Sequence, residues 1–215
     1  LVLPPTVAPI QVVIVPIVFS GKDGETKSGK LVEQACFKVQ EELTRAGMRT
    51  VVDNSEERPG AKFYRWEMKG VPLRIEIGPR DLRNEQCELV RRNDFTRVQI
   101  PLNEVVHCVK QTLQEIHEAL HEKAKETLRT SIYETRHIST AASEEELEEL
   151  RRRAGHGILS LFLCGRESCG NEVEARLGVS VLGEAVHGFI QLTHAEGTCL
   201  ICSDGGKRVY VARAY

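Results

Sequence analysis

Residues 11–19 read QVVIVPIVF, a nearly continuous run of β-branched residues. Such a run is typical of a strand that is buried on both faces, as the inner strands of a parallel sheet are. A helix is expected to follow, capped at its start by Ser28 and closed by Gly47. Its apolar face is expected to hold Leu31, Ala35, Val39 and Leu43. A buried strand followed by an amphipathic helix is a usual opening of an α/β domain.

Short periodic segments continue this domain. In the segment 73–77, Arg74 and Glu76 alternate with three apolar residues, which predicts a half-buried strand with these two side chains on an open polar face. The other elements expected are strands at 50–53, 86–92 and 98–100 and a helix at 59–69 that begins with Pro59 and ends before Gly70. This order of strands and helices predicts an α/β fold with a mixed sheet flanked by helices.

The second half of the chain changes character. Apolar residues recur every three or four positions from Leu102 to Ile132, which predicts a long amphipathic helix. Ser143 and Glu146 have the spacing of a capping box for a second, shorter helix. From Gly155 onward the chain is rich in glycine and cysteine, which indicates a small α+β domain. The expected division is a linker at 1–9, a first domain at 10–130 and a second domain at 131–215.

The composition limits the classes of protein that the chain can belong to. The chain has 215 residues, with 29 Lys and Arg against 31 Asp and Glu, a formal net charge of −2, and 41% hydrophobic residues. These values are normal for a globular protein and exclude a disordered tail, a collagen-like fibre and a highly basic nucleic-acid-binding arm. No apolar run in the sequence approaches the roughly 18 residues that cross a bilayer, and no membrane partner is expected.

The first residues and the number of cysteines indicate the cellular compartment in which the protein is expected. The chain begins at Leu1 instead of Met, and LVLPP has neither the basic region nor the cleavage site of a signal peptide. Residues 1–9 are therefore expected to be a linker from a longer protein. Seven cysteines without an export signal predict a cytoplasmic protein whose thiols are free or bind a metal.

Four of the cysteines form two close pairs near glycines. These are Cys164, Cys169, Cys199 and Cys202. Four thiolates can surround a structural zinc ion tetrahedrally, and His187 and His194 could replace a missing ligand. The alternative is four free cysteines. The other three are expected to be core residues: Cys36, Cys87 and Cys108.

Two further motifs suggest catalysis and have simpler interpretations. His117, Glu118 and His121 form an HExxH motif on the long helix, which could hold zinc with Glu118 as general base; a third ligand would have to come from 144–149. The alternative, which we prefer, is two histidines on a solvated helix. Residues 24–30 match a phosphate-binding loop, but Leu31 stands where Ser or Thr would bind Mg²⁺, so a solvated connection is the better interpretation.

Basic and aromatic residues coincide in one stretch. Residues 58–97 contain ten Lys and Arg against six acids, together with Phe63, Tyr64 and Trp66. This mixture suits unpaired RNA, because guanidinium groups bind phosphates and base edges while rings stack on bases. A charged helix face beside core aromatics would give the same count.

Longer stretches of the chain resemble a known family. WEMKGVPLRIEIGPRDL at 66–82, LVLPPTVAPIQVVIVPI at 1–17, the four paired cysteines and the ending VARAY are similar to the prolyl-tRNA synthetase family, in its archaeal and eukaryote-like type. The similarity covers essentially the whole chain. It implies a class II synthetase anticodon-binding domain followed by a zinc-containing domain, without the catalytic domain and its three motifs.

The resemblance also implies roles for individual residues. The residues matching the family's anticodon readers are Phe63, Glu67, Arg74 and Arg80, and Arg97 could stand in for a lysine that bacterial relatives place after the fourth strand. Tyr215 matches a terminal tyrosine whose carboxylate points toward the active site.

The implied partner is tRNA(Pro), with no DNA. ATP, Mg²⁺ and homodimerisation are expected only through the missing catalytic domain, so this chain alone is expected to be non-catalytic. The alternatives are a stand-alone tRNA-binding module and an HExxH zinc hydrolase.

Overall fold

The computed structural model describes residues 1–18, 27–135, 143–184 and 196–213. The chain divides into two compact units, Leu1–Lys123 and Ala124–Tyr215. No helix among the described residues is both long enough and apolar enough to pass through a membrane.

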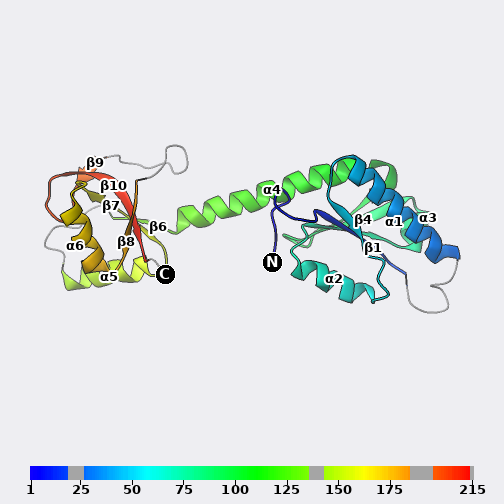
Figure 1. Ribbon diagram of the computed structural model, residues 1–215, viewed down its shortest axis with the longest axis horizontal. Helices are drawn as coiled ribbons and strands as arrows, with labels where there is room; N and C mark the ends of the chain where they lie inside the picture. The colour runs from blue at the N-terminus through cyan, green and yellow to red at the C-terminus, as the bar shows by residue number, and fades with distance from the viewer. Residues whose placement is uncertain (19–26, 136–142, 185–195, 214–215) are drawn as a thin grey trace. The chain divides into compact units, whose positions relative to one another are not determined.

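The first unit is built on a five-stranded mixed sheet in the order β2-β1-β3-β4-β5 (Figure 1). β1 is parallel to both of its neighbours, whereas β3, β4 and β5 pair antiparallel. The strands are β1 (Val12–Pro16), β2 (Thr50–Val52), β3 (Leu73–Ile77), β4 (Gln86–Arg91) and β5 (Arg97–Pro101). The mixed sheet expected from the sequence is confirmed.

Helices cover both faces of this sheet. α1 and α4 lie on one face and α2 on the other (Figure 1). The helical elements are α1 (Lys27–Arg45), α2 (Pro59–Met68), α3 (Pro79–Arg83), a short 3₁₀ turn (Leu102–Glu104) and α4 (Val105–Thr130). The first face forms the main core, in which Cys36 and Cys87 are fully buried and Cys108 packs at the edge, as the sequence predicts. Burial and the neighbouring Glu33 raise the pKa of Cys36, and burial raises that of Cys87, in each case to about 12.

The buried stripe of α1 is rotated from the one expected. The residues that contact the core are Val32, Cys36, Val39 and Leu43, while Leu31 is 54% exposed. A stripe drawn only at intervals of four drifts around a helix of 3.6 residues per turn. Alternating intervals of four and three keep the stripe on one side, and the observed residues follow that spacing.

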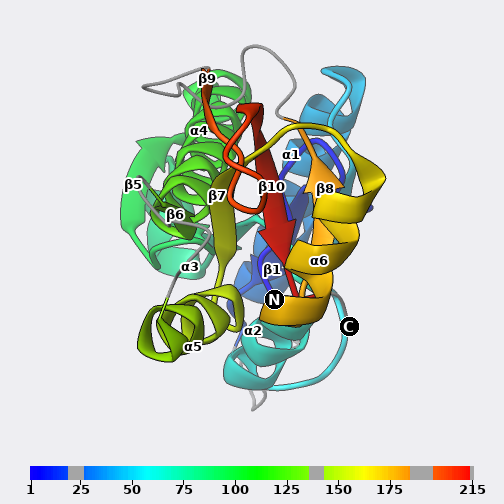
Figure 2. The ribbon, with the colours of Figure 1, turned by 90° about the vertical axis from the view of Figure 1, so that its left-hand side faces the viewer.

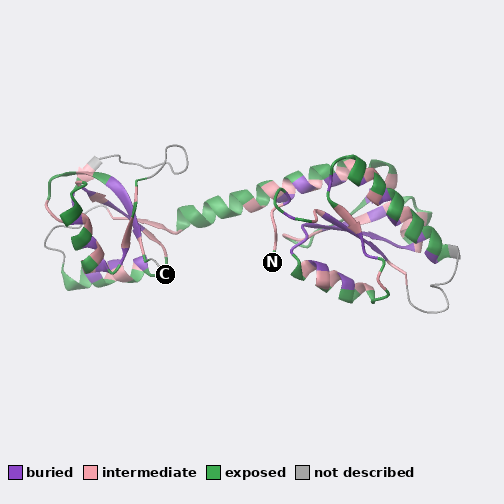
Figure 3. Ribbon diagram, in the orientation of Figure 1, coloured by how far each residue is buried: buried purple, intermediate pink, exposed green. Residues whose placement is uncertain are grey.

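Only the first half of α4 is buried. Its buried residues are Val105, Val109, Leu113 and Ile116, and residues 121–130 are all exposed (Figure 3). The apolar periodicity beyond Leu120 is therefore not used as a core face within the described chain. The helix ends at Thr130, and Ile132 belongs to a strand instead.

The register of β3 decides which side chains meet α2. Arg74 and Glu76 pair with Val13 and Val15 of β1, and these two valines pack under α2. Arg74 and Glu76 therefore point to the α2 side of the sheet. The sequence predicted an open face here, and this is wrong, because both residues are only 8% exposed.

Residues 1–9 are attached to this unit. The Leu3 amide donates to the Gly70 carbonyl at 3.1 Å, and Arg49 Nε donates to the Ala8 carbonyl at 2.9 Å. Gly70 has φ +74, and a Cβ there would lie 2.9 Å from Leu1 Cγ. The close approach of the N-terminal segment therefore requires glycine at position 70.

The second unit contains a sheet in the order β6-β7-β10-β8, with β9 paired to β10. Figure 2 shows β10 between β7 and β8, beside helix α6. The elements are β6 (Ile132–Glu134), α5 (Glu144–Ala154), β7 (Ile158–Leu163), α6 (Glu167–Leu177), β8 (Ser180–Gly183), β9 (Glu196–Thr198) and β10 (Gly205–Ala212). The predicted capping box of α5 is confirmed: Ser143 N donates to Glu146 Oε2, and Glu146 N to Ser143 Oγ.

Candidate nucleic-acid interface and metal site

The helix that carries Phe63 and Glu67 is fixed by one buried carboxylate. Asp53, which follows β2, accepts hydrogen bonds from Trp66 Nε1 at 2.6 Å, Arg65 Nη2 at 2.5 Å and Ser55 Oγ at 2.7 Å. Burial alone would raise the pKa of Asp53, but the bonds from Ser55, Trp66 and Arg65 outweigh it and lower the pKa to about 2. α2 is thereby tied to the edge of the sheet by charge-assisted bonds.

This network accounts for part of the basic stretch. Lys62 is buried, and its Nζ donates to the Asp53 carbonyl at 3.0 Å. Arg65 also pairs with Glu57 at 2.8 Å. Both cations therefore hold α2 in place, and the buried Lys62 is not available as a surface for RNA.

Phe63, Glu67 and Arg74 form one connected group. Arg74 Nη1 donates to Glu67 Oε1 at 3.0 Å, and Arg74 Nε donates to Glu76 Oε1 at 2.9 Å. The Arg74 Cζ atom lies 3.9 Å from the centroid of the Phe63 ring. The Arg74 side chain is 9% exposed and that of Glu67 27% exposed, so Glu67 is the more accessible of the two.

The group extends across the sheet through Glu76. Arg97 of β5 lies 3.5 Å from Glu76 Oε1 and 2.6 Å from Glu88 Oε2. The register that pairs Arg74 with Val90, and Val90 with Arg97, puts these side chains on the same face. Acidic and basic groups therefore alternate across β3, β4 and β5. Sequence reasoning did not assign a role to Glu76 or Glu88, because strand pairing and not chain spacing brings them to Arg74.

Arg80 is separate from this group. It lies in the first turn of α3, is exposed, and has no side-chain partner among the residues that the structure describes. The structure therefore joins three of the four residues expected to read a base and leaves the fourth on a neighbouring element.

The arrangement offers complementary hydrogen-bonding groups at a surface. Within the described chain, Glu67 Oε2 and Arg74 Nη2 have no protein partner. A carboxylate oxygen accepts, a guanidinium nitrogen donates, and a phenyl ring lies beside them. This combination fits the edge and face of an unpaired nucleobase.

The HExxH motif does not assemble a metal site among the described residues. The His117 and His121 rings lie on α4 with centroids 6.3 Å apart, and Glu118 accepts a hydrogen bond from Gln114 Nε2. Within the described ranges, the single group of three or more potential metal ligands lies elsewhere. Residues 24–26 of the phosphate-loop motif lie outside the described residues, and the rest of it begins α1.

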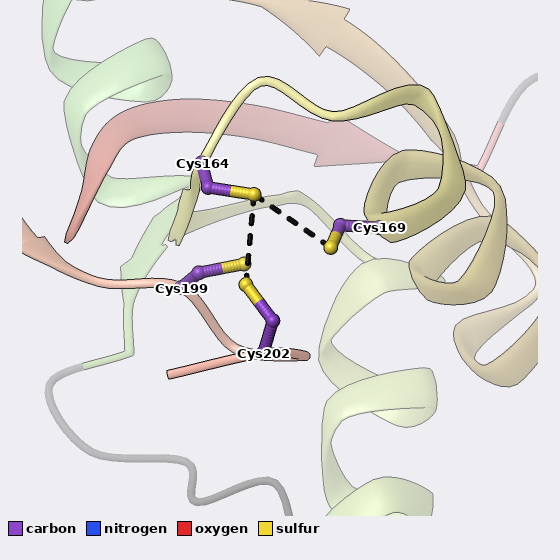
Figure 4. A group of neighbouring side chains, drawn as sticks. All are labelled: Cys164, Cys169, Cys199 and Cys202. Carbon is purple, nitrogen blue, oxygen red and sulfur yellow. Dashed lines mark hydrogen bonds between the residues drawn. The ribbon is translucent and has the colours of Figure 1, made fainter. Parts of the chain in front are cut away.

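The four paired cysteines converge (Figure 4). Their Sγ atoms all lie within 4.8 Å of one another, with Cys164 Sγ 3.6 Å from both Cys169 Sγ and Cys202 Sγ. Cys164 follows β7, Cys169 lies in the first turn of α6, and Cys199 and Cys202 lie in the turn between β9 and β10. Four thiolates from three segments can hold one metal ion. His187, His194 and Tyr215 lie outside the described residues.

Arg166 lies against this cluster. Its Nε lies 3.3 Å from Cys164 Sγ and its Nη2 2.9 Å from Cys202 Sγ, and it also pairs with Asp204. The Arg166 guanidinium is the main cause that lowers the pKa of the Cys164 thiol to about 6. A cation in this position favours the thiolate, which is the form that binds metals.

Known proteins match this chain over long stretches. Residues 11–112 match the anticodon-binding domain family HGTP_anticodon. The chain is 41% identical to a proline–tRNA ligase of Methanosarcina mazei over 219 residues, which covers 100% of this chain and 41% of that protein. It is 42% identical to a proline–tRNA ligase of Thermococcus kodakarensis over 183 residues, or 85% of this chain and 35% of the relative.

A solved structure is similar over the same extent. The crystal structure of prolyl-tRNA synthetase from Cryptosporidium parvum complexed with L-proline and AMP superposes with a TM-score of 0.83 at 29% identity, covering 100% of this chain and 42% of that one. The chain thus spans about two fifths of the length of these relatives. Residues 11–112 are therefore an anticodon-binding domain, and the chain is homologous along its whole length to the C-terminal part of prolyl-tRNA synthetases.

Proposed function

We propose that the chain binds the anticodon of tRNA(Pro) as part of a proline–tRNA ligase. The observation that supports this most is the contact of Arg74 with both Glu67 and Phe63 inside an anticodon-binding domain. The complete ligase would activate proline with ATP and Mg²⁺ and transfer it to the tRNA in the cytoplasm. ATP, Mg²⁺ and homodimer formation would involve a catalytic domain outside this chain.

The proposed roles follow from the donors and acceptors of guanine. Proline anticodons share two consecutive guanines, each with acceptors at O6 and N7 and donors at N1 and N2. Glu67 Oε2 would accept from N1 or N2, and Arg74 Nη2 would donate to O6 or N7. Phe63 supports the guanidinium from one side and offers the rest of its ring for stacking. Arg80 would supply a further donor from α3.

We propose that the four-cysteine site holds a structural zinc ion. Zinc–sulfur bonds of about 2.3 Å in a tetrahedron require sulfurs about 3.8 Å apart. The observed separations of 3.6 Å, with all pairs within 4.8 Å, fit this requirement. Four thiolates fill the coordination sphere and leave no position for an activated water, so the ion would stabilise the fold of residues 131–215.

The assignment of Glu67 can be tested by anticodon discrimination. We expect the 215-residue chain to bind RNA stem-loops that carry two guanines in the anticodon more tightly than loops in which one guanine is replaced. Glu67→Gln should reduce this preference by about 1–3 kcal/mol for one of the guanines, because an amide NH₂ then faces the base donors. Fluorescence anisotropy with labelled stem-loops measures both affinities.

Glu57→Gln is the matched control. It is also a glutamate paired with an arginine of this unit, at 2.8 Å, but it lies beside Arg65 and not beside Arg74. This variant should keep the guanine preference of the wild type. Equal preferences in Glu67→Gln and wild type would remove Glu67 from the proposed site.

A second prediction concerns catalysis by the chain alone. We expect no proline-dependent exchange of pyrophosphate into ATP with the purified chain. Activation requires Mg²⁺ and positively charged groups held against the nucleotide, and the motifs that supply them are not in this sequence. Radiolabelled pyrophosphate exchange provides the measurement, with a complete archaeal proline–tRNA ligase as positive control. Exchange by the chain would show that it contains an active site of its own.

A further inference from the structure

A small pocket lies next to the proposed guanine readers. Its lining includes Glu67 and Arg74, together with Arg92 and Phe95 of the turn between β4 and β5. The turn is closed by hydrogen bonds between Arg91 and Thr96 and from Phe95 N to the Arg91 carbonyl. Two side chains without an assigned role therefore border the same space as two of the expected readers.

The turn presents the Phe95 ring to solvent. Phe95 is 55% exposed and has φ +60, which is a sparsely populated backbone region for an aromatic residue. Asp94 stabilises the turn, because its Oδ1 accepts from the Thr96 amide at 3.0 Å. An exposed ring held by a strained turn beside basic side chains is suited to stacking on an unpaired base.

Arg92 differs from the other arginines of the pocket. Arg74 is paired with Glu67 and Glu76, and Arg91 with Glu115 at 3.0 Å. Arg92 has no ion pair within the described ranges, and its buried Nε, like that of Arg91, has no hydrogen-bond partner there. Its Cζ lies 5.0 Å from the centroid of the Phe95 ring, and its backbone amide is bonded to the Pro72 carbonyl.

These observations indicate that, among the residues described, the guanidinium of Arg92 lacks a hydrogen-bond acceptor and a negative charge beside it. A buried donor without an acceptor and an arginine without a counter-charge favour an anionic, oxygen-rich ligand. The adjacent ring favours a flat aromatic group. A nucleotide supplies both features, with its phosphate for the guanidinium and its base for the ring.

We infer that Arg92 and Phe95 bind the nucleotide that flanks the guanines read by Glu67 and Arg74. Phe95 stacks on the flanking base, and Arg92 donates to its phosphate. This inference rests on the proposed anticodon-binding function. Because stacking and phosphate contacts do not depend on the identity of the base, the pair contributes affinity and not guanine preference.

Phe95→Leu is the main test. Leucine keeps an apolar side chain and has the same difficulty with a positive φ, so the turn should be affected little. We expect the chain with Phe95→Leu to bind the two-guanine stem-loop about tenfold more weakly, and the guanine-replaced loop weaker by the same factor. Arg92→Gln should lower both affinities in parallel and make binding less dependent on salt.

The control is Phe37→Leu, which removes an aromatic side chain that is 46% exposed on α1, on the opposite face of the sheet from α2, and does not line the pocket. It should bind like the wild type. Thermal melting of each variant, followed by the fluorescence of Trp66, verifies that the unit remains folded.

Stem-loops with an abasic site on either side of the guanines identify the stacked base. At one of the two positions, the wild type should lose about tenfold in affinity and Phe95→Leu should lose almost nothing more. Affinity of Phe95→Leu within twofold of Phe37→Leu for every loop would overturn the inference while leaving the guanine preference, and with it the proposed function, intact. A wild type without guanine preference would instead contradict the proposed function.

Discussion

Loss of the proposed metal is expected to unfold residues 124–215 while leaving the first unit folded. We expect Cys199→Ser, or treatment of the wild type with a strong chelator, to abolish amide-exchange protection in β7, α6 and β10. The reason is that the four thiolates come from three segments of a unit whose core is small, so the free energy of metal binding would be a large part of its folding free energy. Hydrogen exchange read by mass spectrometry resolves the two units.

Two controls accompany this experiment. Cys108→Ser changes a partly exposed cysteine at the edge of the first core and should leave metal content and exchange unchanged. Trp66 is the only tryptophan in the sequence, so its fluorescence should report an intact first unit throughout. Elemental analysis should find about one equivalent of zinc in the wild type. A metal-free wild type with full amide-exchange protection in the second unit would refute the metal site. Retention of zinc in Cys199→Ser together with its loss in His117→Ala would show that the zinc binds to α4 instead.

Asp53→Asn is expected to destabilise the first unit by about 2–3 kcal/mol. The Asp53 side chain is 3% exposed and accepts bonds from Ser55, Trp66 and Arg65, and an amide cannot accept from all of them. Urea unfolding followed by Trp66 fluorescence measures the change. Glu57→Gln, which removes the exposed partner of the same Arg65, should cost less than about 1 kcal/mol.

The pH dependence of this effect has a definite sign. The pKa of Asp53 is about 2 in the folded chain against an ordinary value of 3.8. The stabilisation, about 2 kcal/mol, is therefore fully present above about pH 4 and is lost as the pH falls toward 2. In Asp53→Asn, the unfolding free energy should lose the share of its decrease between pH 4 and pH 2 that comes from protonation of Asp53. An equally steep loss of stability in the variant and the wild type would show that other groups cause it.

The sequence predicted the elements of the first unit because local signals there are strong. The β-branched run of β1, the proline and glycine at the ends of α2, and the alternation in β3 each depend on neighbours in the chain. The burial of Arg74 and Glu76 could not be predicted in this way. It depends on pairing with β1 and on cover from Phe63 and Glu67, both of which are properties of the assembled sheet.

The candidate sites likewise include one part that the sequence predicted and one part that depends on the assembled fold. The spacing of the four cysteines was sufficient to predict that they converge, because ligands of one metal come in close pairs. The basic stretch was a poorer guide. Lys62 and Arg65 proved to be partners of Asp53. Charge counting could not distinguish them from Arg92, which lines a pocket and has no ion pair of its own within the described chain.

The position of β10 in the second sheet has a consequence for synthesis on the ribosome. β10 is the last of these strands to be translated, yet β7, β8 and β9 all pair with it. Until residue 212 has left the exit tunnel, β8 and β9 have no described partner strand, and Cys199 and Cys202 precede the strand that anchors their turn. The second unit therefore stays incompletely folded, with its thiols accessible, until β10 has been synthesised. The first unit is complete by residue 123 and can fold much earlier.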